Sequence, residues 1–210
     1  MDYIDPRTGN PKIILDLCGG TGAWSKPYKE AGYDVRLITL PDYDVLTYEP
    51  PADVYGILAA PPCTEFSLAK NGSRRKRDLA LGMKIVRACL EIIWKCQIHG
   101  KLAFWAMENP RGLLRRFMGK SVMTFDPWQY GDEWTKKTDL WGYFNPPKPV
   151  VSVPPEGMTK RYANGKSNAF YWSTCNDRVP DWYDGPKLDR AARRSITPPG
   201  FAQAFFKASR

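Results

Sequence analysis

The chain has 210 residues, a net charge of +9, 43% hydrophobic residues and five cysteines. This length allows one substantial hydrophobic core with a small appended lobe, and it excludes two full domains. No run of about 18 apolar residues occurs, which excludes a membrane-spanning helix of the usual kind. The first residues lack the charged and apolar regions of a signal peptide, and the scattered cysteines are typical of a reducing compartment, so we expect a cytoplasmic protein.

The predicted elements of the first two thirds alternate between strand and helix, which indicates an α/β fold with a mostly parallel sheet and helices on both faces. Strands are predicted over residues 12–17, 33–40, 52–60 and 102–107, and helices over 24–31 and 78–99. A short helix over residues 112–118 and two closing strands over 121–130 and 137–144 follow. In the longest helix, apolar residues recur every three or four positions and are predicted to face the core: Leu81, Ile85, Cys89, Ile92 and Cys96.

The composition changes after the last predicted strand, and it suggests three parts. Residues 1–144 form the predicted catalytic and cofactor-binding core. Residues 145–190 are rich in proline, glycine, asparagine and aromatic residues, and we interpret them as a small irregular lobe that recognises a target. Residues 191–210 carry a terminal helix that begins near Pro198-Pro199 and packs back on the core.

Excess positive charge favours a polyanionic partner such as nucleic acid. Five basic residues fall within eight positions: Lys70, Arg74, Arg75, Lys76 and Arg77. Such a run can be no more than a solvated surface. Because it follows the strongest chemical motif of the chain, described below, we interpret it as a loop that contacts phosphates.

A glycine-rich turn follows the first predicted strand. Residues 16–22 read Asp-Leu-Cys-Gly-Gly-Thr-Gly. Glycines at a strand-to-helix turn adopt positive φ angles and let the backbone approach a ligand closely. Such turns can also serve helix packing alone, so the pattern favours a nucleotide-like cofactor at this edge of the sheet without requiring one.

A cysteine follows two prolines at the end of the third predicted strand. Residues 60–63 read Ala-Pro-Pro-Cys, and the prolines fix the backbone that carries Cys63. The thiolate form of a cysteine is a strong nucleophile. A lone cysteine is by default a buried structural residue, but the Pro-Pro-Cys setting beside a basic loop favours a nucleophile.

An acidic residue follows the next strand, in Glu108-Asn109-Pro110. A carboxyl group carried out of a buried strand can have a raised pKa, as a general acid at neutral pH requires. Glu108 could instead cap the short helix that follows. Because the carboxyl ends of parallel strands share one edge of the sheet, we expect the three motifs to meet in one crevice.

In this order, the motifs resemble the DNA cytosine-5 methyltransferases, and most closely the short members carried by phages and prophages. The resemblance rests on residues 16–22, Pro62-Cys63, Glu108-Asn109, and a later segment in which Gln129-Tyr130-Gly131 precedes Lys136-Lys137-Thr138. It extends over residues 12–144, with a weaker similarity at residues 194–197. It implies a Rossmann-like methyltransferase fold that uses S-adenosylmethionine as donor.

The resemblance also implies a covalent mechanism. Cys63 would attack C6 of a flipped cytosine while Glu108 hydrogen-bonds N3, and C5 would then accept the methyl group. Loss of the C5 proton would release Cys63. Covalent addition is needed because C5 of cytosine is too weak a nucleophile to react unaided. The base must leave the duplex because the enzyme cannot reach it there.

Further site residues follow from the resemblance. The expected cofactor-binding residues are Asp16, Cys18, Gly19, Gly20, Gly22, Leu40, Asp44 and Pro61. The expected DNA-binding residues are Pro62, Ser67, Lys70, Arg74, Arg75, Lys76, Arg77, Asn109, Lys136 and Lys137. Lys160, Arg161 and Asn164 in the irregular lobe are expected to select the target sequence. We expect no metal, and a monomer acting in a bacterial or phage-infected cell.

Three departures from the family pattern concern the cofactor and the later segment. Cys18 stands where the family commonly has phenylalanine, and Lys136 and Lys137 replace the usual arginines. The second predicted strand ends without the common ribose-binding carboxylate, although Asp42 lies just beyond. These departures leave open a catalytically inactive DNA-binding relative or an unusual donor. An RNA substrate also stays open, because the chemistry at C5 would be the same.

Two other enzyme classes fit the residues less well. Amino-group methyltransferases need a polar residue before Pro-Pro and an aromatic residue after it, and Ala60 and Cys63 supply neither. A zinc deaminase needs a second cysteine three residues after the first and a His-x-Glu element. Phe66 occupies the first of these places, and the only histidine, His99, lacks the glutamate.

Overall fold

The computed structural model describes residues 3–71, 73–98, 100, 102–155 and 179–210. The fold is built on a six-stranded sheet with the order β2-β1-β3-β4-β6-β5. Four strands are parallel, namely β1 (Ile13–Leu17), β2 (Asp34–Ile38), β3 (Val54–Ala59) and β4 (Phe104–Pro110). Strand β6 (Thr138–Tyr143) is antiparallel to both β4 and β5 (Met123–Phe125). The predicted α/β fold with a mostly parallel sheet is confirmed, and the arrangement is compatible with a Rossmann-like fold.

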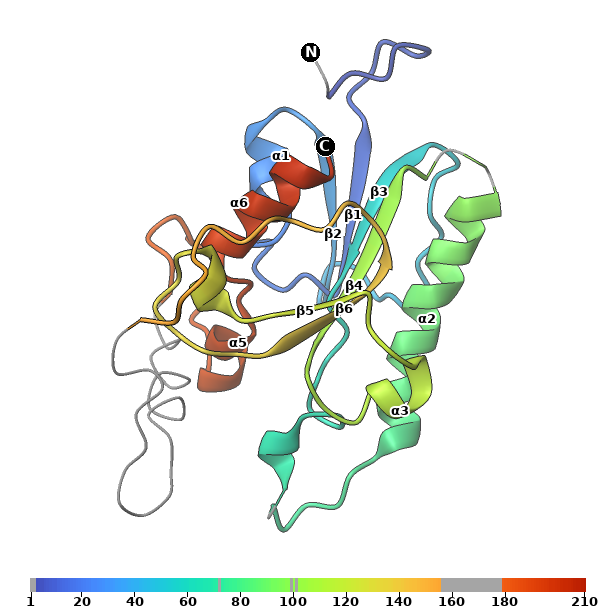
Figure 1. The fold of residues 1–210 in the computed structure, drawn as a ribbon. Helices are drawn as coiled ribbons and strands as arrows, with labels where there is room; N and C mark the ends of the chain where they lie inside the picture. The colour runs from blue at the N-terminus through green and yellow to red at the C-terminus, as the bar shows by residue number, and fades with distance from the viewer. Residues whose placement is uncertain (1–2, 72, 99, 101, 156–178) are drawn as a thin grey trace.

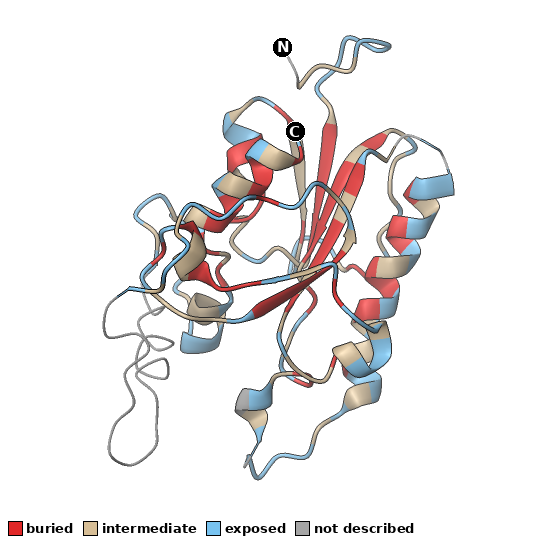
Figure 2. Cartoon of the chain, viewed as in Figure 1, coloured by how far each residue is buried: buried red, intermediate tan, exposed pale blue. Residues whose placement is uncertain are grey.

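Helices cover both faces of this sheet (Figure 1). Helices α1 (Lys26–Glu30) and α6 (Pro199–Ala208) lie together on one face, and α2 (Leu79–Ile98) and α3 (Arg115–Met118) lie on the other. Each face has its own apolar cluster. Because both faces are covered, the central strands are nearly continuous apolar runs, and all five residues of β1 are buried (Figure 2).

Helix α2 shows how the apolar spacing becomes a packed face. The carboxylate of Asp78 accepts the amide of Leu81 and caps the helix, and the buried side includes the predicted Cys89, Ile92 and Cys96. The prediction that Leu81 faces the core is wrong. Leu81 is 49% exposed, because it lies in the first turn, where α2 extends past the strands (Figure 1).

The terminal helix α6 is anchored by aromatic contacts. Phe201 stacks on Phe125 with ring centroids 3.8 Å apart, and Phe205 meets Trp24 edge-on at 5.4 Å. Phe205 also contacts Phe104 of β4, which ties the end of the chain to the centre of the sheet. Such ring pairs stabilise a core beyond their buried area.

Two predicted elements have different bounds in the structure. The strand predicted over 102–107 continues to Pro110, so Glu108 and Asn109 belong to β4 itself. The strand predicted over 121–130 is present but much shorter, as β5 over Met123–Phe125. After β5 the chain forms the 3-10 helix η2 (Pro127–Tyr130), because Asp126 and Gln129 make a capping box and Pro127 favours a first helical position.

The segment expected to form an irregular lobe is described only in part. Its described residues, 145–155 and 179–189, contain no helix or strand. A short helix that was not predicted, α5 (Arg190–Ser195), follows, and Asp189 caps it. The expected recognition residues Lys160, Arg161 and Asn164 lie outside the described residues. None of the helices in the described ranges is long and apolar enough to cross a membrane.

We predict that Phe205→Ala lowers the free energy of unfolding by about 3–5 kcal/mol, because it removes a fully buried ring and leaves a cavity between α6 and the sheet. Denaturant titration followed by circular dichroism measures this loss. Trp94→Ala is the control, since Trp94 lies on the outer side of α2 and is 67% exposed. Equal losses in the two variants would contradict the role given to α6.

Candidate active site

The carboxyl ends of β1, β3 and β4 meet at one edge of the sheet, as expected from their parallel course. A small pocket of about 60 Å³ lies there, and we call it the inner pocket. Its lining combines the glycine-rich turn, the Pro-Pro-Cys segment, Glu108 and Pro110 of β4, Lys136, and the link between α5 and α6. Among the lining residues are Asp16, Cys18, Gly19, Gly20, Pro61, Pro62, Cys63, Glu108, Lys136 and Thr197.

The glycine-rich turn leaves its backbone open toward this pocket. Gly20 has a φ of +56°, and a Cβ atom added there would meet no atom within 4 Å. At Gly19 an added Cβ would lie 2.3 Å from the carboxyl group of Asp16. Only glycine therefore fits at residue 19, and the turn keeps a bare main-chain surface. Cys18 also has a positive φ, of +57°, which is uncommon for a residue with a side chain.

Asp16 places a buried carboxyl group behind the turn. Ser25 donates a hydrogen bond of 2.6 Å to one carboxyl oxygen, whereas Oδ1 is buried without a hydrogen-bond partner. Burial raises the pKa of Asp16 to about 7, against the opposing effect of the Ser25 hydrogen bonds. Asp16 thus offers an unsatisfied acceptor at the wall of the inner pocket.

Hydrogen bonds to carbonyl oxygens hold the Cys63 segment in place. The side-chain amide of Asn109 on β4 donates a 2.9 Å hydrogen bond to the carbonyl oxygen of Pro61. The carbonyl oxygen of Cys63 accepts from the backbone amides of Phe66 and Ser67, which closes a tight turn directly after the thiol. Cys63 is therefore fixed from β4 on one side and by its own turn on the other.

The charge state of Glu108 influences the ionisation of Cys63. Burial raises the pKa of both side chains, and the positive charge of Lys136 opposes the rise at each. The charged form of Glu108 raises the pKa of Cys63 further, whereas Arg194 lowers it. A proton on Glu108 removes that like-charge effect and so makes the thiol more acidic. Oε2 of Glu108 is buried and has no hydrogen-bond partner, so this carboxyl group can bind an incoming polar atom.

A wider cleft of about 680 Å³, which we call the outer cleft, opens beside Cys63. Its walls come from the basic loop after Cys63, the segment before β6, and α5 (Figure 1). No acidic residue is among the described residues that line it, and six of them are basic. The basic residues are Lys70, Arg75, Arg111, Lys136, Lys137 and Arg194. A concave surface with one sign of charge attracts a polyanion.

Several predicted site residues lie away from both cavities. Leu40 is 71% exposed. A carboxyl oxygen of Asp44 accepts a hydrogen bond from the backbone amide of Leu46 within its own turn. Gly22 lies in the turn but does not line the inner pocket. Asn109 is fully buried and supports Pro61, so its side chain does not reach the outer cleft.

The predicted DNA-binding residues divide into groups. Four basic residues and Ser67 line the outer cleft, and the basic ones are Lys70, Arg75, Lys136 and Lys137. The other two exposed members of the run, Arg74 and Lys76, do not line it, and Arg77 binds the loop internally.

Sequence reasoning missed the contributions of Arg111 and Arg194 to the outer cleft. Arg111 directly follows the Glu-Asn-Pro motif, and its backbone amide donates to the carbonyl of Lys137. Arg194 belongs to α5, whose beginning was signalled by Asp189, a favourable capping residue placed before a run of alanine and arginine.

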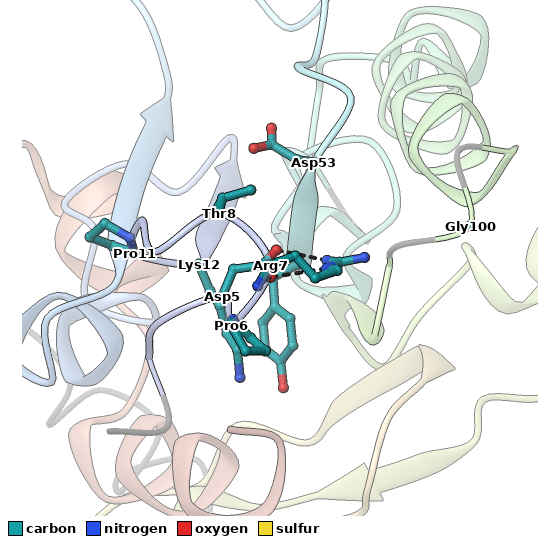
Figure 3. Close-up of a pocket in the computed structure, with 9 residues that line it drawn as sticks. Asp5, Pro6, Arg7, Thr8, Pro11, Lys12, Asp53 and Gly100 are labelled. Carbon is teal, nitrogen blue, oxygen red and sulfur yellow. Dashed lines mark hydrogen bonds and ion pairs between the residues drawn. The ribbon is translucent and has the colours of Figure 1, made fainter.

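A separate cavity of about 290 Å³ lies at the opposite, amino-terminal end of the strands (Figure 3). It is lined by the segment before β1, by Asp53 and Tyr55, and by Gly100. Arg7 pairs with Asp5 across it, and Lys12 lies over the Tyr55 ring. The cavity contains none of the predicted site residues, and its charges already balance one another.

Compared with known proteins, the chain matches no protein-family model, and no curated protein sequence matches it significantly.

We predict that Asp16→Asn reduces the pH dependence of stability. A carboxyl group with a raised pKa in the folded chain binds more protons when folded, so the free energy of unfolding falls as the pH rises from about 4 to about 7. Asparagine keeps an acceptor for Ser25 and removes the charge. When the pH rises from about 5 to about 8, the free energy of unfolding of the variant should fall by about 2–3 kcal/mol less than that of the wild type.

Denaturant titrations at the two pH values measure this difference. Asp132, whose pKa burial also raises to about 6, continues to titrate in both proteins. Asp42→Asn, at an exposed residue, is the control and should leave the pH dependence unchanged. An Asp16→Asn variant with the wild-type pH dependence would show that Asp16 does not carry the buried charge.

Proposed function

We propose that this protein transfers a methyl group from S-adenosylmethionine to C5 of cytosine in DNA, with Cys63 as the nucleophile. One observation carries the proposal. Cys63 and Glu108 line the same pocket as the glycine-rich turn, although the three come from different strand ends. A nucleophile, a group able to hold a proton and an open main-chain turn are the components that this reaction needs.

The residues of the inner pocket fit S-adenosylmethionine chemically. This donor carries an ammonium group and supplies an electrophilic methyl group on a sulfonium centre. The unpaired Oδ1 of Asp16 is an acceptor suited to a cation, and the bare backbone at Gly20 allows close approach of a nucleoside. The pocket of about 60 Å³ has room for little more than water, so it must widen to admit a molecule of this size.

Cys63 would begin the reaction as a thiolate that bonds to C6 of cytosine. The electron pair displaced onto C5 would make that carbon nucleophilic. C5 would bond to the methyl carbon of the donor as the methyl–sulfur bond breaks, and the sulfur would keep that electron pair as a neutral thioether. A base removes the C5 proton, the C5–C6 double bond re-forms, and the bond between Cys63 and C6 breaks. Lys136 and Arg194 favour the thiolate because both oppose the effect of burial on the pKa of Cys63.

Glu108 would hold the cytosine ring through its N3 atom. N3 of neutral cytosine accepts a hydrogen bond, so it pairs with the protonated carboxyl group. Burial raises the pKa of Glu108 and therefore favours this form. The proton on Glu108 also favours ionisation of Cys63, so the form that binds the base is the form that activates the nucleophile.

The outer cleft supports DNA as the substrate. Its six basic residues surround the approach to Cys63, and phosphate contacts of this kind provide affinity without reading sequence. A target base must be extruded from the duplex to reach the half-buried Cys63, at a cost of a few kcal/mol. Contacts between the cleft and the flanking phosphates offset that cost.

The decisive experiment uses methyl-labelled S-adenosylmethionine with duplex DNA, followed by digestion and identification of the labelled nucleoside. We expect 5-methylcytosine, and none from Cys63→Ala. DNA containing 5-fluorocytosine should form a gel-stable adduct with the wild type, because fluorine cannot leave C5 as a proton does.

Cys89→Ala is the control, because Cys89 is buried in the α2 core and should retain adduct formation. An adduct that persists in Cys63→Ala would exclude this nucleophile. DNA binding without any methyl transfer would instead favour an inactive DNA-binding relative. Label in RNA, when RNA replaces DNA in the same assay, would make RNA the substrate.

We also predict that Glu108→Gln lowers turnover about 10²–10⁴-fold, because glutamine keeps the shape of the side chain but cannot exchange a proton with N3. Donor binding, measured by calorimetry, should change little. Glu91→Gln on the exposed side of α2 makes the same chemical change away from the site and should keep full turnover. Near-normal turnover in Glu108→Gln would leave the residue a structural role only.

A further inference from the structure

A buried carboxylate lies at the root of the basic loop that forms one wall of the outer cleft. We use "basic loop" for residues 68–78, of which Gly72 lies outside the described residues. Glu65 is 5% exposed and makes a salt bridge with Lys70. Arg75 reaches the other carboxylate oxygen at 3.7 Å, and the backbone amide of Asp78 donates a 2.7 Å hydrogen bond.

These contacts join the start, middle and end of the loop through one side chain. Asp78 is also the cap of α2, so Glu65 lies beside the amino-terminal end of a 20-residue helix, where negative charge is favourable. The hydrogen bond from Lys70, followed by that from Asp78, lowers the pKa of Glu65. The carboxylate therefore stays charged at neutral pH.

Arg77 supplies a second link around the same point. Its guanidinium donates 2.8 Å hydrogen bonds to the carbonyl oxygens of Glu65 and Ser67 and to the side chain of Asn71. Two of the five basic residues in the run, Lys70 and Arg77, thus help to fold the loop.

The residue next to Glu65 fixes the root of the loop to the rest of the fold. The carbonyl oxygen of Phe66 accepts the amide of Leu113, and an added Cβ at Gly112 would lie 2.4 Å from that oxygen. The Phe66 ring is fully buried against Gly82 of α2. The root is therefore held by the rest of the fold, and Lys70 and Arg75 contact Glu65 from the loop that leaves it.

The Lys70 side chain is only 9% exposed in its salt bridge with Glu65, whereas the Arg75 side chain is 70% exposed. We propose that Glu65 is a positioning residue for nucleic-acid binding: with Lys70 it closes the basic loop, and so it holds Arg75 on the wall of the outer cleft where DNA phosphates meet it. This inference rests on the proposed function, because it takes DNA as the ligand of the cleft. Holding the loop and its exposed arginine in place before binding reduces the conformational entropy that the complex must lose. Glu65 does not contact the substrate itself.

The direction in which DNA affinity changes when Glu65 is removed distinguishes a positioning role from a purely electrostatic one. Glu65 is a negative charge beside Lys70 and Arg75, at the edge of the cleft. By electrostatics alone, its removal would strengthen DNA binding. If Glu65 positions the loop that carries Arg75, its removal weakens binding although the protein gains one unit of positive charge.

The test compares Glu65→Gln with the wild type. Glutamine keeps an acceptor for the Asp78 amide and loses the charge that holds Lys70 and Arg75. Fluorescence anisotropy with a labelled duplex, over a series of salt concentrations, should show about tenfold weaker binding and a salt dependence flatter by about one phosphate contact. Trypsin should also cleave faster after Arg74, Arg75 and Lys76, while the thermal unfolding midpoint changes little.

Glu49→Gln is the matched control. Glu49 forms an exposed salt bridge with Lys95 on α2, at 2.7 Å, so the variant loses one glutamate–lysine pair and gains the same net charge away from the cleft. Its DNA affinity and loop cleavage should match the wild type.

Unchanged or tighter binding by Glu65→Gln, with wild-type cleavage, would overturn the role of Glu65 and leave the proposed function intact. A wild-type chain that neither binds DNA nor transfers methyl groups would overturn the proposed function, and with it the ligand assigned to the loop.

Discussion

The arrangement of this protein depends on the burial of its parallel strands on both faces. Strands β1 and β3 lie between two helical layers, so their interiors admit almost only apolar side chains. Polar chemistry is therefore confined to the strand ends, and parallel strands bring those ends to one edge. The glycine-rich turn, Cys63 and Glu108 come together for this reason, although they are far apart in the sequence.

The same burial makes it energetically unfavourable for the carboxyl groups at this edge to be charged. Asp16 and Glu108 each keep a buried oxygen without a hydrogen-bond partner, and the pKa of each is raised. A folded chain retains such groups at the expense of stability, which is typical of functional sites. Lys136 moderates the cost, because it favours the charged forms of both Glu108 and Cys63.

The fold and the inner pocket were largely predictable from the sequence. Periodic apolar runs and glycine or proline boundaries fix the order of strands and helices, and strand-end motifs converge by geometry alone. The outer cleft was less predictable, since Arg194 reaches it from α5, a six-residue helix with weak sequence signals. The structural use of Lys70 and Arg77 could not be foreseen either, because ion pairs within a loop depend on how the loop closes.

The hydrogen bond from Asn109 to Pro61 has a consequence for how activity would be lost on heating. It joins the segment that carries Cys63 to β4, the strand that carries Glu108, so the spacing of the two groups is set by the sheet rather than by a surface loop. Local fraying of exposed segments leaves such a spacing intact, and only opening of the central strands destroys it. Thermal loss of the proposed methyl transfer should therefore coincide with global unfolding, whereas the proposed binding of DNA, which depends on a loop, can decline at lower temperatures.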